Sequence, residues 1–549
     1  MKNLILLAFT TVILNASLFA RQHLSENTIQ KVDSLLSEYP ISNGPGISVA
    51  VIKDGKAIFK RHKGYANLEH RILITDSTKF VIGSIAKQFT AFAILLLENE
   101  GLLSIDNSIT NYLPELNHLP HKVTIKQLMN HTSGFRDNTN LNNLKGRTDE
   151  DLIGQEEVVA LLLRQKSLNF TPGSRFQYCN SGYILLAEIV KRVSGISFSQ
   201  FTQEKIFKPL KMHQSVFLDD PTLMVTNKAD SYIKQKDGFH YIPLNRSVVG
   251  STGLYTTIHD LGLWANNFEN QTIGNKTIFQ KMKTKSSLNT GEIIPYALGQ
   301  ELKNHKGLDV IFHGGGDAGF RSYLLRVPSH KLTVAISGNF ESFNPLNISY
   351  GLVDIFLSKN IQKKKKKEIP VYKTKDLKKF EGDYKIFNGF YITIEAKSDT
   401  LYFKNYGSEE KLKLPTIGEN EFLFPYIHHS KFRFTKDGLV WHLSDFYYPG
   451  KKVFLNPPKY EEINISEYTG VYRSAEVETS YTLITEDNQI KMTHNYNPDL
   501  LLEPISKDVF RTNQAYMGEI EFTRNEAGKI NGCKVSAQKA YNIFLNKIE

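Results

Sequence analysis

Cysteine is nearly absent from this chain, which has only two in 549 residues and therefore no disulfide framework. Cys179 and Cys533 lie far apart in the sequence, and we expect both to be free thiols. The His-Glu-x-x-His and Cys-x-x-Cys patterns that hold zinc in many enzymes are also missing. We therefore expect no metal and no cofactor, so that any catalysis would come from side chains alone.

Acidic residues are fewer than basic ones, and the chain carries a formal net charge of +11. An excess of this size can indicate a nucleic-acid partner. Here, however, eight lysines and only one glutamate fall between Ser358 and Lys375, in and around IQKKKKKEIPVYKTK. Such a run is typical of a solvated linker between folded regions. We therefore expect no nucleic-acid partner.

Residues 1–20, MKNLILLAFTTVILNASLFA, combine Lys2 with an apolar middle and a small residue at Ala20. This pattern is typical of a cleaved signal peptide. The segment is too short and too weakly apolar to predict a permanent membrane anchor. Because no cysteine lies near the cleavage region, we expect no lipid anchor either. We expect an exported bacterial protein, either periplasmic or secreted.

Ser84 and Lys87 stand at the start of an apolar helical segment, SIAKQFTAFAILLLENEG. Because they are three residues apart, their side chains lie on one helix face within hydrogen-bond reach. Burial would lower the pKa of the lysine and give it a neutral fraction that can act as a base. An alternative interpretation is a lysine that reaches the surface beside a serine that only caps the helix.

Two later segments carry further groups of the same chemistry. Tyr178 and Asn180 lie in TPGSRFQYCNSGY, where a loop can present a phenol for proton transfer and an amide for orientation. The glycine-rich run at 313–316, His-Gly-Gly-Gly, follows an apolar strand pattern. Glycines in a strand mark a bulge or a close approach, and here a backbone N–H could hold an oxyanion.

These motifs, in this order, resemble the serine β-lactamase-related superfamily. The similar branch contains class C β-lactamases, D-alanyl-D-alanine carboxypeptidases, D-aminopeptidases and esterases. The resemblance covers roughly the first two-thirds of the chain, in the stretches GPGISVAVIKDGK, TKFVIGSIAKQFTAFAILLLENEG, VTIKQLMNHTSGF, TPGSRFQYCNSGY, GSTGLYTTIHDLGLWA and FHGGGDAGF. The resemblance implies that this part of the chain is a hydrolase similar to the penicillin-binding proteins.

The resemblance implies a role for each motif residue. Ser84 would be the acylated nucleophile, and Lys87 with Tyr178 would handle protons, either of the two serving as general base. The groups implied for substrate binding and the oxyanion are Asn180, His313, Gly315 and Gly316. His313 departs from the lysine that many β-lactamases have there, which makes efficient β-lactam hydrolysis a weaker expectation. Cys179, in the middle of Tyr-x-Asn, we interpret as a packed side chain and not a second nucleophile.

The pattern changes beyond the lysine-rich run to short alternating strands at even spacing, which predicts antiparallel barrels or sandwiches. Phe380-Glu-Gly-Asp-Tyr384 and Tyr468-Thr-Gly-Val-Tyr472 stand 88 residues apart and indicate an internal repeat. We expect a signal peptide at 1–20, a hydrolase domain at 21–358, a linker at 359–375 and β-barrels at 376–460 and 461–549. A single lipocalin-like barrel over 376–549 is the alternative.

The predicted fold class is α+β. An antiparallel sheet with flanking helices and a helical region would form the hydrolase domain, followed by all-β barrels. We expect an exported serine hydrolase that forms an acyl-enzyme with amide or ester substrates, first of all peptides that contain a D-residue. The alternatives are a carboxylesterase, a weak β-lactamase, and a penicillin- or cell-wall-binding protein without turnover.

The expected partners are a small-molecule or peptide substrate and, through the barrels, a cell-wall polymer or glycan. The polar stretch THNYNPDL at 493–500 is a candidate for a loop of the second barrel that selects substrates, with an ordinary surface hairpin as the alternative.

Overall fold

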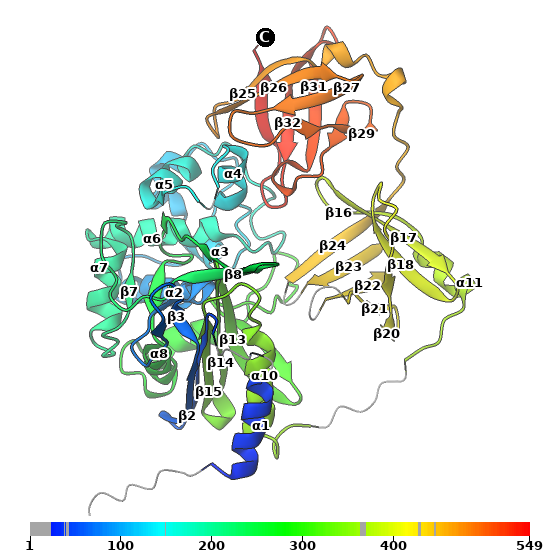
Figure 1. Ribbon diagram of the computed structural model, residues 1–549. Helices are drawn as coiled ribbons and strands as arrows, with labels where there is room; N and C mark the ends of the chain where they lie inside the picture. Colours follow the sequence, from blue (N-terminus) through cyan, green and yellow to red (C-terminus); the bar gives the residue numbers. More distant parts are fainter. Residues whose placement is uncertain are drawn as a thin grey trace, which may run out of the picture.

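The computed structural model describes residues 24–37, 39, 43–148, 150–362, 369–425, 430–443 and 446–548. The predicted signal peptide and residues 363–368 of the lysine-rich run lie outside the described residues. Figure 1 shows a mixed α and β region followed by two all-β bodies. This arrangement confirms the predicted fold class.

A six-stranded antiparallel sheet lies at the centre of the N-terminal region, in the order β12-β13-β14-β15-β1-β2. The first hairpin turns at Asp54 and Gly55, which both have positive φ, as the Asp-Gly pair predicts. The strands are β1 (Ile47–Lys53), β2 (Lys56–Lys63), β12 (Glu301–His305), β13 (Leu308–Asp317), β14 (Phe320–Val327) and β15 (Leu332–Gly338).

Both faces of this sheet are covered by helices. Helices α1 (Glu26–Leu36) and α10 (Pro345–Phe356) pack on one face, and α8 (Ile258–Asn270) packs on the other. Alternate residues of β1 therefore enter different cores: Val49 joins the core of α10, whereas Ala50 joins the core of α8. This explains why β1 is apolar throughout and does not alternate.

The helical region is built around α2 (Ala86–Asn99), which is buried on nearly all sides, as its sequence predicts. Phe89 of α2 stacks on Trp264 of α8 with ring centroids 4.2 Å apart. The surrounding helices are α3 (Ile125–Met129), α4 (Asn138–Leu144), α5 (Gln155–Leu163), α6 (Asn180–Ser194), α7 (Phe198–Thr202) and α9 (Lys276–Lys283). Among the described residues, no helix combines the length and apolarity needed to cross a membrane.

Short strands and turns connect these parts. The strands are β3 (Tyr65–Asn67), β4 (Ile72–Leu73), β5 (Phe80–Val81), β6 (Ile153–Gly154), β7 (Val216–Phe217), β8 (Ser231–Gln235), β9 (Gly238–Ile242), β10 (Arg246–Ser247) and β11 (Leu254–Thr256). The turns include η2 (Gly83–Ile85), η3 (Ile109–Asn111), η4 (Pro114–Leu116), η5 (Gln203–Phe207) and η6 (Pro328–His330).

The first barrel is a nine-stranded antiparallel sheet in the order β19-β18-β17-β16-β24-β23-β22-β21-β20. Its lead-in is α11 (Thr374–Leu377) with η7 (Lys378–Phe380). The strands are β16 (Gly382–Phe387), β17 (Phe390–Lys397), β18 (Thr400–Asn405), β19 (Leu412–Leu414), β20 (Thr416–Gly418), β21 (Glu421–Leu423), β22 (Lys431–Thr435), β23 (Gly438–Leu443) and β24 (Phe446–Val453).

The second barrel repeats the same topology, in the order β28-β27-β26-β25-β33-β32-β31-β30-β29. It follows η8 (Tyr460–Glu462) and η9 (Ile465–Glu467) and contains η10 (Ala515–Met517). The strands are β25 (Gly470–Ser474), β26 (Thr479–Glu486), β27 (Gln489–Thr493), β28 (Leu500–Leu501), β29 (Glu503–Ser506), β30 (Val509–Arg511), β31 (Glu519–Arg524), β32 (Ile530–Ser536) and β33 (Ile543–Lys547).

The internal repeat predicted from the sequence has an equivalent contact in each barrel. The hydroxyl of Tyr384 donates to the carbonyl of Phe380 at 2.8 Å. The hydroxyl of Tyr472 donates to the carbonyl of Tyr468, also at 2.8 Å. Each tyrosine thus connects the first strand of its barrel to the turn before that strand. The two sheets form two nearly closed barrels, and not a single larger barrel.

The second barrel is attached to the helical region through buried polar contacts. The fully buried guanidinium of Arg136 donates to the Glu476 carboxylate at 2.6 Å and to the carbonyls of Tyr541 and Asn542. Removing one partner of such a buried pair costs about 3–5 kcal/mol, because the other charge is left without compensation. The contact fixes the second barrel beside the cavity described below.

Candidate active site

Ser84 lies in the η2 turn, directly before α2, where strand β13 passes very close. A Cβ atom on Gly315 would lie 1.9 Å from the carbonyl oxygen of Ile82, and one on Gly83 would lie 2.5 Å from the amide nitrogen of Gly316. Only glycine permits this approach. The glycine-rich run therefore brings the backbone of β13 against the turn that carries Ser84.

Lys87 is fully buried, and its ammonium makes three hydrogen bonds. It donates at 2.9 Å to the Ser84 hydroxyl, to the side-chain oxygen of Asn180 and to the carbonyl of Ser251. Burial lowers the pKa of Lys87 to about 7, and the positive charge of Lys539 acts in the same direction. Near neutral pH a large fraction of this lysine is thus an uncharged base next to a hydroxyl.

Tyr178 is a buried phenol beside the same pair. Its pKa is raised well above the usual value by burial, while a hydrogen bond with the Ser84 side chain works against this shift. The Lys87 amine lies 4.9 Å from the centre of its ring. At neutral pH Tyr178 is therefore protonated and can donate a proton.

The His131 ring packs against the ring of Tyr178. The centres of the two rings lie 4.2 Å apart, and the backbone N–H of Cys179 donates to Nδ1 of His131 at 3.2 Å. Burial and the charge of Lys87 lower the pKa of His131, so its ring is neutral. These contacts give His131 a structural role in shaping the loop that carries Tyr178.

His313 is buried and hydrogen-bonded within the protein. One ring nitrogen lies 3.2 Å from the Tyr296 hydroxyl and the other lies 2.6 Å from the Gly314 carbonyl. Burial, together with the charge of Lys87, lowers its pKa to about 3. The side chain is neutral at physiological pH and offers no charge to a substrate carboxylate.

The cavity beside Ser84 has a volume of about 400 Å³. It is lined by Ser84, Asn138, Thr139, Asn180, Arg246, Val248, Ser251, Thr252, Gly316, Asp317, Ala318 and Arg321. Of the residues predicted for substrate binding, Asn180 and Gly316 line it, whereas His313 and Gly315 are not among the lining residues. The cavity wall is polar, and Arg246 pairs with Asp317 at 2.8 Å across one side.

Sequence reasoning missed Asn138, which follows the His131-Thr-Ser-Gly stretch and belongs to α4. This residue lines the cavity and is only 8% exposed. Among the described residues, its side-chain oxygen is buried with no hydrogen-bond partner. A buried acceptor of this kind is costly unless a ligand or water donates to it. The only sequence signal was its position seven residues after His131.

A loop of the second barrel at 537–542 reaches the site. The Lys539 carbonyl accepts hydrogen bonds from the backbone N–H of Asp137 and from the amide of Asn169, both at 2.9 Å. The Lys539 ammonium lies 5.5 Å from the centre of the Tyr178 ring. Residues 493–500, the loop proposed from sequence, contact a different place: the amide of Asn497 donates to the carbonyl of Asn143.

Cys179 is a packed thiol, as predicted. Its Sγ donates to the carbonyl of Phe135 at 3.3 Å, and burial raises its pKa to about 12. Cys533 is also buried, and both cysteines are free. Within the described ranges, no group of three or more His, Cys, Asp or Glu side chains could hold a metal ion.

Comparison with known proteins identifies the family. Residues 32–349 match the family model named Beta-lactamase. The chain belongs to the Beta-lactamase family. The match contains the Ser84, Tyr178 and Gly316 motifs, and the chain is a β-lactamase-family serine hydrolase.

Related proteins extend the similarity into the barrels. A D-aminopeptidase of Brucella anthropi is 23% identical over 521 residues, 92% of this chain and 96% of that protein. A D-aminopeptidase of Gluconobacter oxydans is 29% identical, with 57% of this chain and 58% of that protein covered. The octameric penicillin-binding protein homologue from Pyrococcus abyssi shares the fold, with a TM-score of 0.55, 23% identity, and coverage of 85% of this chain and 98% of its own.

Proposed function

We propose that this protein hydrolyses amides, above all peptides with a D-residue, through an acyl-enzyme at Ser84. The observation that carries the proposal is the buried Lys87 amine at 2.9 Å from the Ser84 hydroxyl. Its pKa of about 7 suits a general base that works near neutral pH.

The first half of the reaction would follow from this geometry. The uncharged Lys87 amine accepts the hydroxyl proton of Ser84 while the serine oxygen bonds to the substrate carbonyl carbon. The backbone N–H groups of Ser84 and Gly316 hold the resulting oxyanion. Tyr178 donates its proton to the leaving amine as the C–N bond breaks, and the Lys87 ammonium restores the proton of the phenol.

Water completes the cycle. Water gives a proton to the pair of Lys87 and Tyr178 as its oxygen attacks the ester carbonyl. The same pair returns a proton to the Ser84 oxygen as it leaves. Near neutral pH Lys87 is the base of the two, because its pKa of about 7 leaves a large fraction uncharged, whereas Tyr178, whose pKa is raised well above its usual value, keeps its proton. Tyr178 serves as the proton donor to the departing group. Asn180 holds the Lys87 amine in place through its side-chain oxygen.

The choice of a D-residue substrate rests on relatives and on charge. Two relatives are named D-aminopeptidase. The neutral His313 removes the strand cation that would attract a β-lactam carboxylate, so β-lactamase activity is the weaker alternative. The buried Asn138 oxygen would accept a hydrogen bond from an amide or amine of the substrate. We further propose export through residues 1–20 to the periplasm or the medium.

A substrate panel tests the proposal. Rates would be measured for D- and L-aminoacyl amides, D-Ala-D-Ala peptides, nitrophenyl esters and penicillins. Faster turnover of a D-aminoacyl amide than of its L-isomer would support the proposal. Turnover of esters alone would indicate a carboxylesterase, and a stable penicillin adduct without turnover would indicate a penicillin-binding protein. Either of these results would overturn the proposed substrate class.

A further inference from the structure

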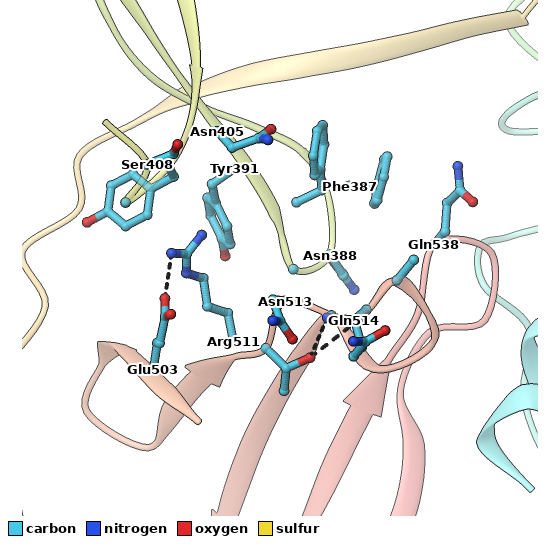
Figure 2. Close-up of a pocket in the computed structure, with 17 residues that line it drawn as sticks. Phe387, Asn388, Tyr391, Asn405, Ser408, Glu503, Arg511, Asn513, Gln514 and Gln538 are labelled. Atoms are coloured by element: carbon cyan, nitrogen blue, oxygen red, sulfur yellow. Dashed lines mark hydrogen bonds and ion pairs between the residues drawn. The ribbon is translucent and has the colours of Figure 1, made fainter. Parts of the chain in front are cut away.

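A second cavity lies between the two barrels, far in sequence from Ser84. Its volume is about 470 Å³, within the range of about 300–1,000 Å³ that is usual for small-molecule sites. Figure 2 shows side chains of both barrels around it, with Tyr391 and Asn405 from the first barrel opposite Arg511 and Asn513 from the second. Neither barrel alone would form this cavity.

The walls of the cavity are held in place by Glu519. Its carboxylate accepts hydrogen bonds from the Lys385 ammonium at 2.7 Å and from the Tyr391 hydroxyl at 2.6 Å. The turn at Gly389 approaches the other barrel so closely that a Cβ there would lie 2.0 Å from the carbonyl carbon of Gly518. The cavity is thus preformed by contacts that do not need a ligand, which lowers the ordering cost of binding.

Five side-chain amides line the cavity, more than any other polar group. They belong to Asn388, Asn405, Asn513, Gln514 and Gln538. Among the described residues, none of these amides makes a hydrogen bond within the chain. Each amide offers both donors and an acceptor, which suits a ligand that presents donors and acceptors of its own, such as hydroxyl and acetamido groups.

The same cavity has an aromatic wall and no net charge. The rings of Phe387 and Phe390 stack with centroids 4.9 Å apart and an interplanar angle of 17°. Phe390 is stacked on Trp441 as well, so Phe387 would supply the apolar surface for the C–H side of a sugar ring or an acetyl methyl group. The one guanidinium in the lining, Arg511, is paired with Glu503 at 2.5 Å. An anionic ligand therefore gains little, and an uncharged one is favoured.

From the free amides, the aromatic wall and the balanced charge we infer that the inter-barrel cavity binds an uncharged oligosaccharide of N-acetylated hexosamines. An extended peptide is a weaker fit, because among the described lining residues only Glu503, at the start of β29, belongs to an edge strand along which a backbone could align. The site is independent of the chemistry at Ser84, and it would hold the hydrolase on a sugar polymer.

Calorimetric titration of the full-length protein with a β-1,4-linked tetramer of N-acetylglucosamine tests this inference. We expect saturable binding with one site per chain, unchanged in Ser84→Ala. Asn405→Ala and Asn513→Ala should each weaken binding about three- to tenfold, the effect of one lost hydrogen bond. Asn546→Ala, an exposed asparagine on the second barrel outside the cavity, is the matched control.

Three results would overturn the inference. The first is no heat of binding at millimolar sugar. The second is sugar binding by Asn405→Ala and Asn513→Ala that is as tight as that of the unaltered protein. The third is tighter binding of a tetrapeptide than of the sugar. The glucose tetramer, which lacks the acetamido groups, should bind more weakly than the N-acetylated one. Nitrophenyl ester hydrolysis by Asn405→Ala and Asn513→Ala should stay at the wild-type rate, which shows that these variants are folded.

Discussion

The pKa of one residue, Lys87, sets the expected pH dependence of this enzyme. Because burial lowers that pKa to about 7, the uncharged base predominates above this pH and is lost below it. We expect kcat/KM to rise with pH through about 7 and then level off, falling about tenfold per pH unit on the acid side. Measuring ester hydrolysis between pH 5 and 9 checks this.

Substitution of the same lysine separates its role from that of other lysines. Lys87→Met should abolish hydrolysis, whereas Lys411→Met should leave it unchanged, because Lys411 is an exposed residue paired with Glu395. Lys411 also stands three residues after a serine, so it is a matched control for the motif. A pH profile that is flat across this range would show that Lys87 is not the titrating base.

Among the elements, the loop at 537–542 affects the site most directly. The charge of Lys539 contributes to the lowered pKa of Lys87. Lys539→Met should therefore raise that pKa and move the acid limb of the pH profile to higher pH, with little change at high pH. The matched control is Lys534→Met, on β32 and paired with Glu521. An unmoved acid limb in Lys539→Met would contradict this role.

The contrast between two loops of the second barrel shows where sequence reasoning ends. The spacing of Ser84 and Lys87 is a local helical property, so their contact could be predicted. The residue sequence of 493–500 marked it as a loop but contained no information on where the barrel docks. Asn497 instead contacts α4, and Lys539 reaches Tyr178. Such contacts depend on the packing of whole domains.

At the scale of the molecule, the buried pair of Arg136 and Glu476 joins the second barrel to the hydrolase region. Glu476→Ala would leave the guanidinium buried and unpaired, which should lower the free energy of unfolding by about 3–5 kcal/mol. Glu478→Ala removes the half-exposed partner of Arg164 and should cost no more than about 1 kcal/mol. Urea unfolding of both variants compares these costs, and equal values would contradict the structural role of Arg136.

The sequence predicted the order of the parts better than their mutual contacts. The repeat of Tyr384 and Tyr472 and the even strand spacing were sufficient to predict two barrels. Arg136 and Glu476 lie 340 residues apart, and neither belongs to a recognisable motif. Asn138 also lacks one, because its importance comes from its place in the cavity lining and from its buried side-chain oxygen. Features of this kind become visible only when tertiary packing is known.

The central claim is that Ser84 is the nucleophile, and mass spectrometry of protein quenched during turnover tests it most directly. With a nitrophenyl ester, we expect the protein mass to increase by the acyl mass, and peptide digestion should map this increase to Ser84. The adduct should be absent from Ser84→Ala, which should keep its fold and lose its activity. An adduct on another residue, or hydrolysis that persists in Ser84→Ala, would contradict the account.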